Sequence, residues 1–472
     1  MSLKFYEIIR NIAYAVSSNA ISLVISTVVT LIVPKLIGVE EYGYWQLYVL
    51  YASFIGFFQF GWNDGIYLRY AGENYKELDK SLFYSQFWTL FGTQIFFSII
   101  ISVIGLFFSN DPEKKIIVLT TAVAMIAAGV RAMPLFILQA TNRIKEYAII
   151  TTIDKLSYII IIIVALIFGI RNYQILIVAD LIGKIISLFL STYYCKDIVF
   201  RKVNSFALNV TEIMSNIQGG VKLMIANLSS TLVIGIVRWG IEDTWDIATF
   251  GKVSLTLSIS SSMMIFINAI GIIIFPILRN TKLEKLPMIY RTIRDILMAI
   301  LFGMLILYYP LKEIITIWLP NYAESFKYMA LIFPIIVYEG KMSLLINTYF
   351  KTLRKEQTML IINVLSMFLS LVVTFFTTRV FINLDFAILS ILLLLVFRVS
   401  FSEIVLASYL KISIKKDVIS EWILTFLFVF FGWKFDSWLT LYFYLLAFCL
   451  YLIFKRKDFM QSFKNIRFFI KK

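Results

Sequence analysis

Histidine is absent from this 472-residue sequence, and only two cysteines occur in it, Cys195 and Cys449. The absence of histidine excludes imidazole general bases, histidine metal ligands and histidine proton relays. The two cysteines fall in separate apolar stretches, so neither a disulfide framework nor a metal site is expected. Any step coupled to protons or cations must therefore use carboxylates.

Charged residues are also scarce, since they make up 15% of the chain, against about 25% in soluble proteins. Hydrophobic residues make up 60% and aromatic residues 17%. A water-soluble core cannot absorb this much apolar surface, which indicates that lipid surrounds the chain. Because one span needs about 20 apolar residues, the composition predicts an all-α polytopic membrane protein.

Apolar runs separated by short charged loops predict about 14 spans. They lie near residues 12–33, 43–62, 82–108, 116–140, 148–170, 174–195, 222–241, 251–277, 294–317, 326–350, 359–382, 385–409, 420–434 and 437–454. The first run is too long for the core of a signal peptide, so we expect a retained span. We expect three parts: a six-span bundle at 1–200, a second at 201–410, and a two-span hairpin with a basic tail at 411–472.

Lysine and arginine are distributed unequally between the predicted loops. About 29 of the 44 lie on one side, among them Arg291, Arg294 and the C-terminal tail. The positive-inside rule then places both termini in the cytoplasm. The net charge of +15 therefore reflects this asymmetry and contact with anionic membrane lipids, and no nucleic-acid partner is expected.

Two sequence landmarks recur at nearly the same distance. Lys145–Glu146 and Lys355–Glu356 are 210 residues apart, and a long apolar run follows each of them. Tyr42–Gly43 and Phe250–Gly251 are 208 residues apart. Because six predicted spans separate the copies, both have the same orientation, which indicates a parallel pseudo-repeat.

Under this repeat Arg131 corresponds to Lys341, and each is a single cation in the fourth span of its half. Each precedes its basic turn by about ten residues, or roughly 15 Å of helix, which is near the bilayer middle. A charge at that depth usually faces the bundle interior or a cavity. We expect both to face a shared, water-accessible interior and to form, with Arg398, a site for an anionic group. The alternative is structural pairing, for which Glu339 or Glu403 is available.

Four carboxylates are candidates for coupling transport to protons or cations: Asp64, Asp180, Glu339 and Glu403. Asp180 and Lys184 are spaced i,i+4, which predicts a local ion pair. Asp154 and Lys155 lie nearer the cytoplasmic face, where snorkelling toward water is expected.

Catalytic motifs are not found in the sequence. There is no serine–base pair, no Gly-rich phosphate loop and no Cys/His cluster, and the stretch 196–222 is too short for a nucleotide-binding domain. We therefore predict no catalytic residue, no metal and no cofactor. The predicted outer loops are short, which places the function inside the membrane.

The stretch VPKLIGVEEYGYWQLYVLYASFIGFFQFGWNDGIYLRYAGE (33–73) resembles the N-terminal signature of Wzx-type polysaccharide repeat-unit flippases of the MOP exporter superfamily. The matching elements are Pro34, Gly38, Tyr42–Gly43, Gly61, Gly65, Arg69 and Ala71, with the turn TFGKVSL (249–255) in the second half. The resemblance implies a MATE-like fold in the bacterial inner membrane and alternating access between two bundles around a cationic cavity. The hairpin at 420–454 departs from the 12 spans of many members and is similar to the related peptidoglycan-precursor flippases.

The resemblance also implies a cargo and partners. The cargo is an undecaprenyl-diphosphate-linked oligosaccharide for capsule or O-antigen synthesis, moved from the cytoplasmic to the outer leaflet. The implied partners are a polysaccharide polymerase and glycosyltransferases. One alternative is that the chain itself is such a membrane polymerase or glycosyltransferase, although a long outer loop with acidic or arginine clusters is missing. Another is a drug or cation exporter of the same fold, which requires unpaired carboxylates in its cavity.

Overall fold

A computed structural model describes residues 20–108, 110–202, 206–262, 264, 283–435 and 437–470. Within these residues the chain is helical and contains no β-strand, which confirms the predicted all-α class. The chain divides into two compact units, Met1–Leu228 (unit 1) and Ser229–Lys472 (unit 2). The following paragraphs take each unit by itself.

Long apolar helices dominate the described part of the chain. Nine of its helices are long and apolar enough to cross a membrane, and two further pairs of helices, each bent at a short break, raise the number to eleven. The bent pairs are Pro320–Ile332 with Ile335–Thr352, and Leu439–Phe454 with Arg456–Ser462. Parts of two predicted spans, residues 12–19 and most of 263–277, lie outside the described residues.

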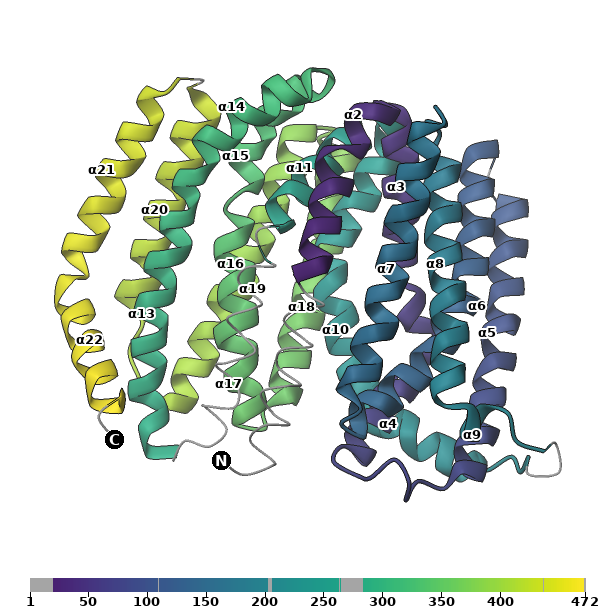
Figure 1. The fold of residues 1–472 in the computed structure, drawn as a ribbon. Helices are drawn as coiled ribbons and strands as arrows, with labels where there is room; N and C mark the ends of the chain where they lie inside the picture. The colour runs from purple at the N-terminus through teal and green to yellow at the C-terminus, as the bar shows by residue number, and fades with distance from the viewer. Residues whose placement is uncertain are drawn as a thin grey trace. The chain divides into compact units, whose positions relative to one another are not determined.

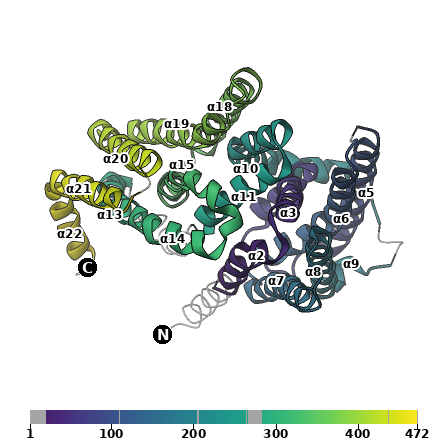
Figure 2. The same cartoon turned by 90° about the horizontal axis from the view of Figure 1, so that it is seen from above.

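Unit 1 is built around α6, which contacts helices on several sides (Figure 1). The first described span of unit 1, Ala20–Ile37, ends in α2 (Val33–Ile37). The helices that follow it in this unit are α3 (Val39–Ala52), α4 (Trp62–Tyr70), α5 (Lys80–Phe108), α6 (Pro112–Ala140), α7 (Ile144–Ile167), α8 (Tyr173–Tyr194), the short α9 (Lys196–Val199) and the first part of α10 (Val210–Thr244). Seen from above, α5 lies beside α6 and α7 beside α8 (Figure 2). Small residues of α6, such as Ala124 and Ala127, are buried, which allows neighbouring helices to approach closely.

The predicted span 43–62 is not one continuous helix. It forms α3, a 3-10 turn at Ile55–Gln59 and the start of α4. The interruption coincides with Phe60 and Gly61, whose φ angles of 51° and 77° are left-handed and therefore incompatible with a continuing α-helix. Because the stretch is apolar on both sides of the break, hydropathy alone does not reveal the interruption of the helix.

Glycines allow α4 to touch α10 within unit 1. A Cβ atom on Gly65 would lie 1.8 Å from the carbonyl oxygen of Asn216, and one on Gly220 would lie 2.0 Å from the carbonyl oxygen of Gly61. Both obstacles are backbone atoms, which cannot rotate away. Helix pairs in membranes commonly use such small residues for close packing.

Gly65→Ala is therefore expected to destabilise the protein by about 1–3 kcal/mol, because the added methyl group forces the two backbones apart. The measurement is thermal unfolding in detergent, followed by loss of the monodisperse peak in size-exclusion chromatography. Gly92→Ala in α5 is the matched control, since a Cβ atom there meets nothing within 4 Å. Equal melting of both variants and the wild type would contradict the close contact.

Unit 2 is built around α19 (Leu384–Leu410), which packs against several of its neighbours. The other helices are the second part of α10, α11 (Ile247–Ser262), α13 (Leu286–Met304), α14 (Tyr308–Trp318), α15 (Met329–Ile332), α16 (Ile335–Lys341), α17 (Asn347–Thr352), α18 (Glu356–Phe375), α20 (Lys415–Lys434), α21 (Leu439–Phe454) and α22 (Arg456–Ile470). A π-helical segment at Met342–Ile346 follows Lys341, and such segments are frequent at functional sites. The predicted C-terminal hairpin corresponds to α20 and α21, and α22 then packs against α13 (Figure 1).

Candidate functional site

Unit 1 contains a hollow of about 410 Å³. Its wall combines apolar and aromatic side chains with four charged ones, contributed by the span Ala20–Ile37 and by α3, α7 and α8. The charged residues are Asp154, Lys155, Asp180 and Lys184. Since charges are expensive within a membrane and usually face a cavity, this hollow, called the unit 1 cavity, is a candidate binding site.

Arg131 stands directly behind the wall of the unit 1 cavity. Its Nη1 atom donates to Oδ2 of Asp154 at 2.6 Å and to Oγ of Ser187 at 2.7 Å. The arginine side chain is 17% exposed, and that of Asp154 is 16% exposed. The predicted snorkelling of Asp154 toward water is thus wrong, because its carboxylate turns toward the guanidinium of another helix.

Asp180 is the centre of a second polar group in this wall. It forms an ion pair with Lys184, which confirms the predicted i,i+4 pair, and accepts a hydrogen bond from the Tyr48 hydroxyl at 2.5 Å. Tyr48 in turn stacks on Trp45, with ring centroids 5.4 Å apart. These contacts fix the orientation of the carboxylate in the wall.

Lys155 differs from the other charged residues of the unit 1 cavity. Its Nζ donates to Oγ of Ser22 at 2.6 Å, and it forms no ion pair with a carboxylate of the described residues. A hydrogen bond to a hydroxyl group does not neutralise the positive charge of a lysine. Lys155 is therefore the group of this wall best suited to attract an anion.

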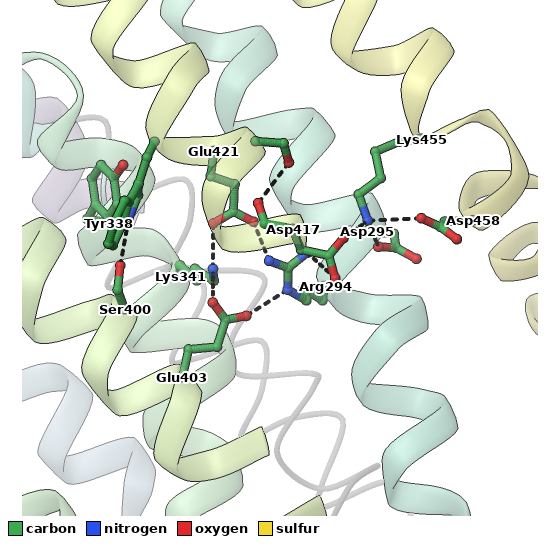
Figure 3. Close-up of polar contacts among 12 residues, drawn as sticks. Arg294, Asp295, Tyr338, Lys341, Ser400, Glu403, Asp417, Glu421, Lys455 and Asp458 are labelled. Atoms are coloured by element: carbon green, nitrogen blue, oxygen red, sulfur yellow. Dashed lines mark hydrogen bonds and ion pairs between the residues drawn. The ribbon is translucent and has the colours of Figure 1, made fainter. Parts of the chain in front are cut away.

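Lys341 lies within a network of buried charges in unit 2 (Figure 3). Its side chain is 1% exposed, and its Nζ atom forms ion pairs with Glu403 and, at 2.7 Å, with Glu421. Arg294 contacts the same two carboxylates, with Nε 2.6 Å from Glu403 and Nη2 2.5 Å from Glu421. These four residues, called the buried quartet, carry two positive and two negative charges and are neutral together.

The buried quartet corrects two predictions. Lys341 is not an isolated cation, because Glu403, one of the two carboxylates considered for pairing, lies beside it. Arg294, predicted from the sequence to be among the basic residues of the cytoplasmic loops, is instead inside unit 2, where it is 1% exposed. Glu421 was missed, although a carboxylate inside the apolar run of the hairpin was a usable signal. Whether Lys341 contacts a substrate stays a prediction.

A second group of charges lies next to the buried quartet, at the bend between α21 and α22 (Figure 3). Lys455 forms an ion pair with Asp417, donates to Asp458 at 3.0 Å and lies 3.6 Å from Asp295. Burial lowers the pKa of Lys455, but its hydrogen bond with Asp417 and the other carboxylates outweigh this effect and raise it. The lysine therefore stays charged and connects the hairpin to α13.

Arg398, the third predicted substrate contact, is fully buried in unit 2. Its Nη2 atom lies 2.5 Å from Oε1 of Glu339, and its Nη1 atom donates to the hydroxyl of Ser230 at 2.8 Å. Two predicted site residues, Arg398 and Glu339, are thus brought together as a pair. Their roles in binding and coupling stay predictions.

The four predicted coupling carboxylates fall into two kinds. Asp180, Glu339 and Glu403 each have a cationic partner. Asp64, in the first turn of α4, forms no ion pair with any described residue. A carboxylate without a cation is the easiest of the four to protonate or to load with a cation, so Asp64 stays the simplest candidate.

Comparison with known proteins shows the fold to which these sites belong. No protein-family model matches the chain, and no curated protein matches its sequence. An inward-facing MATE-family multidrug resistance transporter of the MOP superfamily has a similar structure, with a TM-score of 0.64 and 10% identity, over 82% of this chain and 95% of the transporter. The lipid II flippase MurJ in an inward closed conformation has a TM-score of 0.63 and 14% identity, over 95% of this chain and 99% of MurJ.

A third similar structure is a MOP-superfamily transporter from Pyrococcus furiosus, with a TM-score of 0.50 and 11% identity, over 85% of this chain and 96% of that one. The chain therefore has the all-helical fold of the MOP-superfamily transporters, which confirms the predicted MATE-like class. Several apolar helices of span length in the same chain indicate a multi-pass membrane protein.

Proposed function

We propose that the protein is a flippase that moves an undecaprenyl-diphosphate-linked oligosaccharide from the cytoplasmic to the outer leaflet by alternating access. The fold supports this proposal, because MurJ, described as a lipid II flippase, is similar along almost its whole length. The resemblance of residues 33–73 to Wzx-type flippases supports the cargo. In this proposal the protein is not an enzyme, and the sugar transferases and the polymerase are its partners.

The observation that carries the proposal is the charge around the unit 1 cavity. Three cations, Arg131, Lys155 and Lys184, face two carboxylates, Asp154 and Asp180. One positive charge is left over, and a diphosphate would compensate it. Because moving a phosphate through hydrocarbon is strongly unfavourable, such a charge lowers the barrier to transfer.

The same cavity argues against the exporter alternative. A transporter of cationic drugs needs carboxylates that are free to receive the cation, whereas Asp154 and Asp180 are both neutralised by basic residues. Lys341 and Arg398 are proposed as further contacts with the diphosphate. Since carboxylates neutralise both in this structure, such contact requires their ion pairs to open during the transport cycle.

An apolar groove in unit 2 provides a place for the lipid tail. It measures about 440 Å³ and lies between α20 and α21, where Leu427, Phe431 and Leu446 are among its lining residues. A polyprenyl chain is apolar throughout, so such a groove could hold it in contact with hydrocarbon. The groove thus fits a cargo that is polar at one end and apolar at the other.

A reconstituted system tests the proposed function. Proteoliposomes with the purified full-length protein are expected to expose a fluorescent undecaprenyl-diphosphate oligosaccharide to an externally added reducing quencher much faster than empty vesicles. The same vesicles are not expected to transport the cationic dye ethidium. Transport of the dye without movement of the lipid would support the exporter alternative instead.

A further inference from the structure

The last helix, α22, has the properties of a helix that lies along a membrane surface. The chain bends by 61° between α21, the second helix of the predicted hairpin, and the start of α22. Apolar residues recur at helical spacing in the sequence of α22, and the basic residues Arg456, Lys457 and Lys464 are exposed. Helices of this kind lie at the boundary between headgroups and acyl chains.

A polar hollow of about 360 Å³ lies between α22 and α13. Its apolar lining includes Met288 and Ile412, and its charged lining is Arg291, Asp295 and Asp458. Arg291 lies in the first two turns of the candidate span Leu286–Trp318, so the hollow opens where this span meets the membrane surface. A lipid headgroup is therefore the ligand with direct access to it.

The cation of the hollow, Arg291, is not paired with either carboxylate of the hollow. Arg291 is exposed and makes no ion pair or hydrogen bond with a described residue, although Asp295 lies one helical turn away on the same face. Asp295 is instead turned toward Ser462, which donates to it at 3.0 Å, and toward Lys455. Asp458 binds the same lysine (Figure 3), but the Asp458 side chain is 54% exposed.

This arrangement offers a cation and an accessible carboxylate to one ligand. The Arg291 guanidinium can hold a phosphate with two hydrogen bonds. The free edge of the Asp458 carboxylate can accept a hydrogen bond from an ammonium group. Gln461 adds a further polar side chain to the lining. A ligand that carries a phosphate and a primary amine a few atoms apart satisfies both charges.

We propose that the hollow between α13 and α22 binds the headgroup of an aminophospholipid, with the phosphate on Arg291 and the ammonium group on Asp458. The acyl chains then leave past Met288 and Ile412 into the bilayer. Such a lipid fixes α22 against α13 and so holds the C-terminal hairpin at the membrane surface. This site depends on the chain lying in a membrane and not on the proposed flippase activity.

Native mass spectrometry of the full-length protein tests the site. The detergent-solubilised protein is titrated with phosphatidylethanolamine, phosphatidylglycerol or phosphatidylcholine of identical acyl chains. We expect one tightly retained phosphatidylethanolamine per chain and about tenfold or more weaker retention after Arg291→Gln. Phosphatidylcholine has the same phosphate but no N–H donor, so it is expected to bind weakly to the wild type.

Variants distinguish binding through Arg291 and Asp458 from non-specific lipid binding. Asp458→Asn is expected to remove the preference for phosphatidylethanolamine over phosphatidylcholine, and Arg291→Lys to restore part of the binding. Lys457→Gln, which removes an exposed charge of α22 outside the hollow, is expected to bind like the wild type. Equal retention of all three lipids, stronger retention of phosphatidylglycerol, or unchanged binding in monodisperse Arg291→Gln would overturn the proposal.

Discussion

Glu421→Gln is expected to lower the free energy of unfolding by about 3–5 kcal/mol, the usual cost when one member of a buried ion pair is removed. Within the buried quartet Lys341 and Arg294 would then share Glu403, and the remaining carboxylate near Arg294 is that of Asp417, 3.7 Å away and partly exposed, so one buried positive charge is compensated less well. The measurement is the melting temperature in detergent by size-exclusion chromatography, and we expect a decrease of about 5 °C or more.

Two further variants decide whether charge balance is the cause. Lys341→Met combined with Glu421→Gln leaves the pair of Arg294 with Glu403, which is neutral, so most of the lost stability should return. Arg379→Gln breaks an exposed ion pair with Asp243, and its effect should be about 0–1 kcal/mol. A double variant that is no more stable than Glu421→Gln would show that the quartet does not act through its charge.

The fold could be predicted because it follows from properties that are local in sequence. Long apolar runs specify membrane helices wherever they occur, and the Asp180–Lys184 pair follows from helical spacing alone. The break between α3 and α4 could not be predicted in the same way. It arises from two left-handed residues, Phe60 and Gly61, within a stretch that is apolar on both sides.

The partners of the deep charges could be predicted only in part. Hydropathy identified Arg131 and Lys341 as cations deep in the membrane, but it carries no information on which helices pack together. Asp154 is 23 residues from Arg131, and Glu421 is 80 residues from Lys341. The requirement that buried charges be paired predicts that partners exist. Only the packing of the helices selects them.

Arg131→Gln is expected to reduce flipping of the diphosphate-linked lipid about tenfold or more, because the guanidinium supplies charge-assisted hydrogen bonds at the unit 1 cavity. The variant leaves Asp154 without its arginine, so some loss of stability is also expected. Flipping is measured in proteoliposomes at a temperature where the variant is still monodisperse. Arg171→Gln, in the exposed loop between α7 and α8, is the control and should flip normally.

The double variant Arg131→Gln/Asp154→Asn distinguishes substrate contact from structural pairing. It removes both charges of the pair, so the fold should regain stability relative to Arg131→Gln. If Arg131 contacts the diphosphate, flipping stays low even though the protein is stable and the net charge of the cavity is unchanged, because the guanidinium is still missing. Recovery of flipping to the wild-type rate would instead show that Arg131 serves only to neutralise Asp154. The anion-binding group of the cavity would then be Lys155, which donates a hydrogen bond to Ser22.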